Sequence, residues 1–335
     1  MLYTLLACTG TPITAPNDTD LGPGTETPTD GVDTDTETVD TDPTGPTGDT
    51  APPLDCTTPP PVPAGGMPFT TFQDWGRAED FDIDGQGYHV SIPARDLRGR
   101  LPNGDTQIIA PNVSDSPAGT RVLPDGNWIV ADVASGSLKR VVTATGGQEV
   151  LLSGLQYPNG VEVSRDGVYA FVGETDGGRV RQVEIATGDQ WEVTSGAPQA
   201  NGVILSNDEQ TLYVGSFGTG KVWGVPRIGP TEWGPKFVLF DQPGVFSGGF
   251  DGINVDACDN VYITEYIRGI VWRSTPDGSE VVRFAELPSS WIPNIRWGHG
   301  IGGWEKDILY VADRDQGRIF AVEAGIEGKK HVLVP

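Results

Sequence analysis

The stretch TLYVGSFGTGKVWGV, residues 211–225, decides the fold. Its apolar core Leu212–Val214 is followed by a glycine-containing turn and by a second alternating segment, Lys221–Val225. Alternation of apolar and polar residues with a period of two, bounded by glycine turns, is the pattern of antiparallel strands. The stretch therefore predicts two neighbouring strands joined by a tight turn.

The same unit recurs from Gly66 onward with a period of about 40–50 residues, which is typical of repeat arrays and propellers. Each unit contains an apolar strand core of three residues: Tyr88–Val90, Trp128–Val130, Ala170–Val172, Leu212–Val214, Val261–Ile263 and Leu309–Val311. Six units of about four short strands each predict an all-β fold, a six-bladed β-propeller over residues 67–335. An open solenoid is the weaker alternative, because the units lack helical segments and a capping unit.

Charge divides the chain into two parts. The 46 acidic and 22 basic residues give a net charge of −24, which excludes a nucleic-acid partner because phosphate binding needs positive charge. Residues 1–66 hold 11 of the acidic side chains and no Lys or Arg, and from Thr9 onward they are almost entirely Thr, Asp, Pro and Gly. Such a composition cannot offset the entropy of ordering. We therefore expect a disordered acidic linker over residues 9–66.

The linker follows Leu5–Cys8, LLAC, which is similar to a bacterial lipobox. In that signal the cysteine is acylated and becomes the new N-terminus, so residues 1–8 would be a partial lipoprotein signal; a chance Ala-Cys pair is the alternative. A lipidated Cys8 would be the one contact with a membrane. It would place the chain in the bacterial cell envelope, at the outer membrane, in the periplasm or at the cell surface. Cys56 and Cys258 either form a disulfide in that oxidising compartment or stay unpaired.

An anchor position precedes each apolar triplet by nine to eleven residues. In repeat order it is occupied by Glu79, Ala118, Asn159, Asn201, Asp251 and His299. The common spacing predicts that the anchors meet at the mouth of the central channel. Carboxylate and amide oxygens are ligands of hard cations such as Ca²⁺, whereas zinc is disfavoured because the set has one imidazole and no thiolate. The alternative is that each Asn-Gly and Asp-Gly pair is an ordinary turn.

This pattern resembles the family of senescence marker protein, gluconolactonase and luciferin-regenerating enzyme, the regucalcin-type propellers. The resemblance extends over roughly residues 70–335 and includes the run Asp251–Asp256 and the last-blade triplet. Members of this family are six-bladed propellers that hold a divalent metal through a Glu, two Asn and an Asp. These come from the first, third, fourth and fifth blades, the order in which Glu79, Asn159, Asn201 and Asp251 occur.

The resemblance implies a role for each residue of the site. Glu79, Asn201 and Asp251 would hold the metal, most simply Ca²⁺, and Asn159 would contact metal-bound water or substrate. Asp251 would also act as general base in the hydrolysis of a lactone. His299 is a candidate proton shuttle or substrate contact, or else a hydrogen-bonded channel residue. Tyr157 departs from the family, several of whose members have at this place an Arg that holds substrate.

The sequence therefore predicts a monomeric, exported and lipid-anchored hydrolase that acts on a sugar lactone or a related cyclic ester and depends on a Ca²⁺-type metal. Its partner would be this small-molecule substrate. The alternative is a non-catalytic surface lipoprotein whose propeller binds a protein or a glycan around a structural metal, since one propeller fold hosts many functions.

Overall fold

The computed structural model of the chain describes residues 54–242 and 249–333. Cys8, the predicted signal and residues 9–53 of the predicted linker lie outside the described residues. Within the described residues, no helix is long and apolar enough to cross a membrane.

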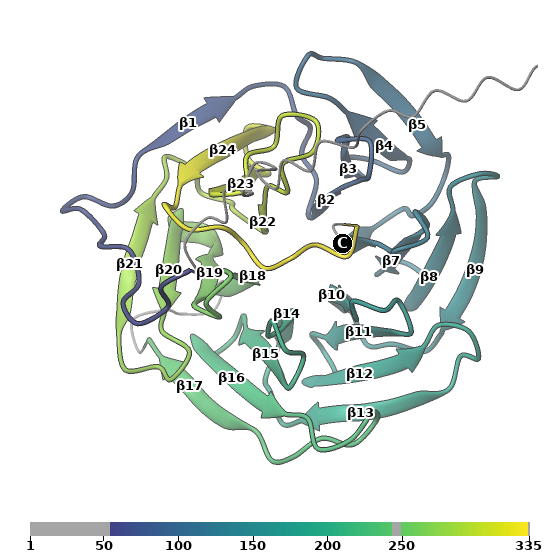
Figure 1. Ribbon diagram of the computed structural model, residues 1–335. Helices are drawn as coiled ribbons and strands as arrows, with labels where there is room; N and C mark the ends of the chain where they lie inside the picture. Colours follow the sequence, from purple (N-terminus) through teal and green to yellow (C-terminus); the bar gives the residue numbers. More distant parts are fainter. Residues whose placement is uncertain (1–53, 243–248, 334–335) are drawn as a thin grey trace, which may run out of the picture. The chain divides into compact units, whose positions relative to one another are not determined.

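Six four-stranded antiparallel sheets are arranged around a common axis as the blades of a propeller, which confirms the predicted fold (Figure 1). The first blade contains β2 (Phe81–Ile83), β3 (His89–Ser91), β4 (Leu97–Arg100) and β5 (Thr106–Ala110). The second contains β6 (Pro117–Val122), β7 (Trp128–Asp132), β8 (Ser137–Val142) and β9 (Gly147–Leu152). The third contains β10 (Pro158–Val163), β11 (Tyr169–Glu174), β12 (Arg179–Glu184) and β13 (Gln190–Ser195).

The next two blades follow the same meander from the axis outward. The fourth contains β14 (Ala200–Leu205), β15 (Thr211–Ser216), β16 (Lys221–Pro226) and β17 (Phe237–Asp241). The fifth contains β18 (Phe250–Val255), β19 (Val261–Glu265), the 3₁₀ turn η1 (Tyr266–Arg268), β20 (Ile270–Ser274) and β21 (Val281–Glu286).

The sixth blade joins the two ends of the propeller. It is built from β22 (Ile295–Trp297), β23 (Ile308–Asp313), β24 (Arg318–Glu323) and, at its outer edge, β1 (Phe69–Phe72). Strand β1 pairs with β24 in the register Phe69↔Val322, so a strand from before the first blade completes the last one. Backbone hydrogen bonds thereby close the ring, in keeping with the short sheet edges of a propeller.

The apolar triplets lie in the second strand of each blade, apart from Tyr88, which directly precedes β3. Leu212–Val214 lies in β15 and is at most 5% exposed, because neighbouring blades cover both faces of the strand. The inner strands β10, β14 and β18 are buried at every position for the same reason. Burial on both faces explains why the period-two alternation is clear in the outer strands and weak in the inner ones.

The described residues begin at Leu54, ahead of the predicted boundary at residue 67, and belong to the same compact unit as the propeller. Cys56 and Cys258 form a disulfide with a Cα–Cα distance of 5.3 Å, so of the two alternatives the paired state is confirmed. Arg273 also donates to the carbonyl of Pro60 at 2.6 Å. The prediction of disorder up to residue 66 is therefore wrong for residues 54–66, because covalent and polar contacts with the fifth blade supply what their composition lacks.

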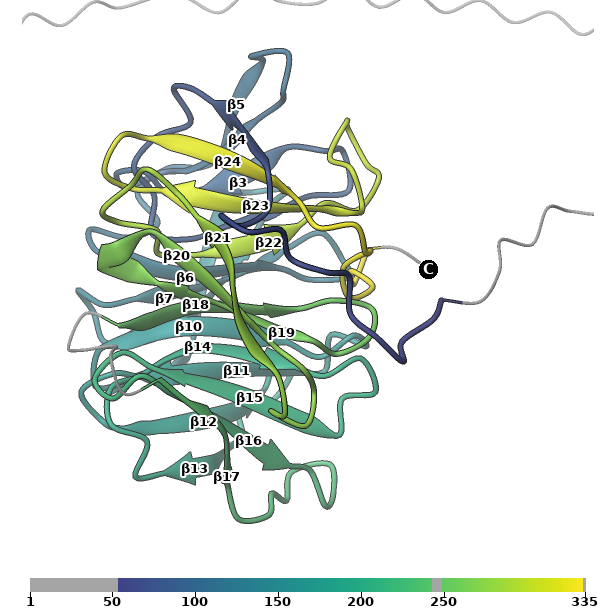
Figure 2. The same cartoon turned by 90° about the vertical axis from the view of Figure 1, so that its left-hand side faces the viewer.

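The segment after β24 returns toward the axis and lies over the inner strands (Figure 1). Lys329 Nζ donates to Glu162 at 2.8 Å and to the carbonyl of Leu205 at 3.0 Å, and His331 approaches Asp82. In the side view this segment lies at the right-hand face of the blades (Figure 2). One end of the axis is thus covered by the C-terminal segment.

Candidate functional site

A β-bulge at the start of four inner strands positions the anchors of blades two to five. In β10, Pro158 pairs with Glu174 and Val161 pairs with Val172, so the register shifts at the intervening Asn159. The same shift occurs in β6, β14 and β18. Bulges bend a strand and redirect its side chains, and they recur beside active sites.

The glycines that follow the anchors allow the inner strands to approach one another. A Cβ added to Gly202 would lie less than 3.0 Å from the carbonyl oxygen of Asp251, and one added to Gly160 would meet that of Asn201 in the same way. Both glycines lie within strands. The interpretation of these dipeptides as turns is therefore wrong, because glycine here serves backbone-to-backbone packing between blades.

The four oxygen-bearing anchors line one cavity of about 310 Å³, which we call the anchor cavity. Its other lining residues are Tyr157, Thr175, Asp176, Gln199, Phe217, Tyr266 and Arg314. Asn159, Asn201 and Asp251 are 8%, 3% and 4% exposed, and Glu79 is partly buried just before β2. The repeat register thus predicted the meeting of these side chains, whereas Ala118 contributes no polar atom.

Burial destabilises the charged forms of both carboxylates of the anchor cavity. Burial, followed by repulsion from Glu79, raises the pKa of Asp251 well above its ordinary value, although a hydrogen bond from the Asn201 side chain opposes the shift. Burial likewise raises the pKa of Glu79, against the attraction of Arg314. Two buried acids facing one cavity leave negative charge that a cation would neutralise.

Arg314 is the cavity residue that the sequence did not single out. It directly follows β23, its side chain pairs with Glu79, and it also contacts the hydroxyl of Tyr266. Burial and the nearby Glu79 raise the pKa of Tyr266 to about 12, so this hydroxyl remains protonated at neutral pH. No repeat pattern points to Arg314, because the corresponding position of the other blades carries no shared residue type.

Two residues of the anchor cavity have a left-handed backbone. Tyr157 has φ 55° and Gln199 has φ 50°, and each stands two residues before an anchor asparagine. Their carbonyls accept hydrogen bonds from Thr175 N–H and Phe217 N–H, both at 3.0 Å. Bulky residues rarely adopt this conformation and do so where the surrounding structure holds them, commonly at functional sites.

His299 does not lie at the anchor cavity, so its predicted register is wrong. Strand β22 ends at Trp297, and the pair Ile295↔Val311 makes Pro293 the equivalent of Asn159 and Asp251. Counting back from the triplet fails in this blade because a longer loop separates β22 from β23. His299 instead lines a separate cavity of about 50 Å³ together with Asp82 and His331.

The tryptophans near His299 pack mainly between blades. Trp297 and Trp304 are each 1% exposed, and Trp297 meets the ring of Tyr262 edge-on at 5.2 Å. Trp291 is 45% exposed and stacks on Tyr266 at 6.3 Å. Trp291 therefore continues the aromatic lining of the anchor cavity, of which Tyr266 is a part, toward solvent.

Comparison with known proteins shows what this chain is similar to. Residues 191–314 match the SMP-30/Gluconolactonase/LRE-like region. Among solved structures, a luciferin-regenerating enzyme has a TM-score of 0.63 at 15% identity, covering 80% of this chain and 99% of its own. A gluconolactonase from Xanthomonas campestris has a TM-score of 0.62 at 15% identity, covering 79% and 94%.

A calcium-binding regucalcin from Agrobacterium tumefaciens is also similar, with a TM-score of 0.60 at 20% identity, covering 78% of this chain and 96% of its own. No curated protein sequence matches the chain. Identities of this size show a shared fold, so the assignment of chemistry depends on the anchor cavity itself.

Proposed function

We propose that the chain is a metal-dependent hydrolase of a sugar lactone or a related cyclic ester, because residues 191–314 match the SMP-30/Gluconolactonase/LRE-like region. The observation that carries the proposal is the convergence of Glu79, Asn159, Asn201 and Asp251 on one cavity from four different blades. A volume of about 310 Å³ is of the size that takes a small organic ligand.

The residues present fit a hard divalent cation, for which we propose Ca²⁺. Glu79 and Asp251 supply anionic oxygens and Asn201 supplies an amide oxygen, and both carboxyl groups are buried together without enough positive charge to compensate them. A bound cation would polarise the lactone carbonyl as a Lewis acid.

The chain's own groups would carry the remaining chemistry. Asp251 would accept the proton of the attacking water, and the Asn201 side chain, hydrogen-bonded to Asp251, would fix the orientation of that carboxylate. Asn159 would hold the substrate from the third blade. Tyr157, where several family members have Arg, favours a substrate recognised through an aromatic face over one held by a cation.

The test is proton release from a panel of aldonolactones and aliphatic lactones by the full chain, with Ca²⁺ and with chelator. We expect turnover that disappears with chelator and falls by more than about 100-fold in Asn201→Ala, as expected when a site loses a central polar group. Asn103→Ala changes an exposed asparagine of the β4–β5 turn and is the matched control. No turnover by folded, metal-loaded protein on any lactone would contradict the proposal.

One observation favours the second candidate, a non-catalytic propeller that binds a protein or a glycan. Arg314 already pairs with Glu79, so the cavity contains a positive charge of its own. Folded protein that binds Ca²⁺ and turns over no lactone would support this candidate.

We also propose that the protein is exported to the bacterial cell envelope as a monomer and anchored through a lipidated Cys8. The disulfide between Cys56 and Cys258 supports an oxidising compartment. Labelled fatty acid should enter the wild-type chain and not Cys8→Ser.

A further inference from the structure

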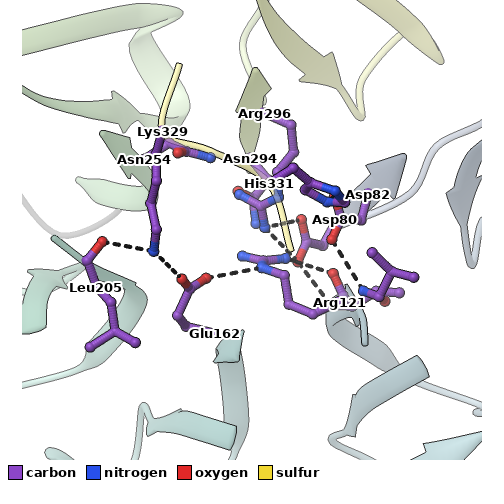
Figure 3. A network of polar contacts seen from close by, with 12 residues as sticks. Asp80, Asp82, Arg121, Glu162, Leu205, Asn254, Asn294, Arg296, Lys329 and His331 are labelled. Carbon is purple, nitrogen blue, oxygen red and sulfur yellow. Dashed lines mark hydrogen bonds and ion pairs between the residues drawn. The ribbon is translucent and has the colours of Figure 1, made fainter. Parts of the chain in front are cut away.

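A second cavity lies at the other end of the inner strands, and we call it the tail cavity. Strand β18 carries Asp251 near its start, at the anchor cavity, and Asn254 near its end, at the tail cavity. Lys329 and His331 of the C-terminal segment line it, and Figure 3 shows Lys329 beside Glu162 and His331 beside Asp82. The two cavities share no lining residue.

Three side chains from distant parts of the chain meet at the tail cavity. Asp82 belongs to β2, His299 follows β22, and His331 lies in the C-terminal segment. One carboxylate oxygen and one nitrogen from each ring all lie within 4.8 Å of one another. His331 Nε2 is 3.2 Å from Asp82 Oδ1, and the two imidazole rings stack with centroids 3.9 Å apart.

The ring of His299 supplies an independent observation. Its Nε2 atom is buried and has no hydrogen-bond partner among the described residues. Burying a polar atom without a partner destabilises the folded state, so such atoms in native proteins call for an explanation. A ligand bound between the three side chains would give this nitrogen its partner.

The surrounding charges leave Asp82 available. Arg296 Nη2 donates to Asp80 at 2.9 Å and Lys329 pairs with Glu162, so these cations are engaged with other acids (Figure 3). Asp82 is 2% exposed and accepts backbone N–H bonds from Ile83 at 2.9 Å and Val122 at 3.1 Å. Such bonds orient a metal-binding carboxylate.

Two imidazoles and one carboxylate favour zinc and related borderline metals over Ca²⁺, which prefers oxygen alone. Tetrahedral bonds of about 2.0–2.1 Å place ligand atoms roughly 3.4 Å apart. The rings of His299 and His331 stack in this structure, so metal binding would require them to rotate until both nitrogens face the ion. His331 would then carry its proton on Nδ1, which gives up the long 3.4 Å contact from the Leu333 N–H. The tail cavity, about 50 Å³, has room for a water as fourth ligand.

We propose that Asp82, His299 and His331 form a second metal site, selective for Zn²⁺ or a similar ion, that fastens the C-terminal segment across this end of the propeller. The ion joins the first blade, the sixth blade and the chain end. It is separate from the anchor cavity, so the site stands or falls independently of the proposed lactonase activity.

The test measures Zn²⁺ affinity and the visible absorption of Co²⁺ in the full chain carrying Cys8→Ser, which removes the one cysteine outside the disulfide. We expect one tightly bound ion, tetrahedral Co²⁺ absorption, and affinity reduced by more than about 100-fold in His331→Ala. His331 lies outside the strands, so its replacement should leave the blades intact. Asp277→Asn, an exposed acid of the β20–β21 turn that lines neither cavity, is the matched control and should bind Zn²⁺ as the parent does.

A second readout follows the C-terminal segment directly. Zn²⁺ should slow tryptic cleavage after Lys329 and Lys330 at least tenfold, and it should not do so in His299→Ala. Failure of the parent chain to bind Zn²⁺ would overturn the proposal. Binding that survives the loss of both histidines, or binding that gives no protection of the segment, would overturn it equally.

Discussion

Replacing Arg314 with Gln tests whether its guanidinium occupies the place of a cation. Arg314 pairs with Glu79 and contacts the hydroxyl of Tyr266. A cation that binds Glu79 must displace this ion pair. Arg314→Gln should therefore tighten Ca²⁺ binding, although it removes a favourable contact from the metal-free protein.

The exposure of the two side chains sets the size of the effect. Exposed ion pairs contribute about 0.2–1 kcal/mol, whereas breaking a fully buried pair costs about 3–5 kcal/mol. The Arg314 side chain is 43% exposed and the Glu79 side chain 15%, which places this pair nearer the exposed limit. We therefore expect the free energy of Ca²⁺ binding to become more favourable by about 1–2 kcal/mol in Arg314→Gln, a factor of roughly 5–30 in affinity.

Titration calorimetry with Ca²⁺ on the wild type and Arg314→Gln measures this factor. Arg318→Gln is the control. Arg318 of β24 likewise pairs with an acid, Asp313, but it does not line the anchor cavity. Affinity in Arg314→Gln that is unchanged or weaker would refute the reasoning, since the guanidinium would then not compete with the cation.

Three further predictions concern stability, each measured by urea unfolding. Gly202→Ala should lower the free energy of unfolding by about 1–3 kcal/mol, because the added Cβ would clash with the backbone of the next blade. Gly85→Ala is the control, since there is room for a Cβ at Gly85, and it should leave the free energy of unfolding unchanged. Hydrogen bonds to Glu174 hold its pKa below its ordinary value despite burial, so the wild type should lose stability as the pH falls below about 4.5. Other carboxyl groups with a lowered pKa, Asp132 among them, keep part of this dependence, so Glu174→Gln should show a shallower slope, and equal slopes would disprove the reasoning. Cys56→Ser removes the disulfide, which links residues 202 positions apart, and should lower the free energy of unfolding by about 2–5 kcal/mol. An unchanged urea midpoint would show that the disulfide does not restrain the unfolded chain.

Local pattern was sufficient to predict the fold. Each unit, such as residues 211–225, carries its own strands and turn, and a sheet of this kind can bury its faces only against similar sheets. The anchor cavity was predictable for the same reason. Asn159, Asn201 and Asp251 occupy one register of a repeated unit, and the closure of the ring turns equal register into proximity.

The sequence by itself therefore determined the architecture and the polar set of the anchor cavity, because both repeat along the chain. Only the tertiary structure decided the positions of Arg314, His299 and His331, because no residue type recurs at their places along the chain. His299 was misplaced because counting assumes loops of equal length, and Arg314 reaches Glu79 only when the ring is closed. The meeting of Asp82 with His331, 249 residues apart, depends on where the chain end comes to lie. Contacts of that kind arise from packing between blades, and no local pattern encodes them.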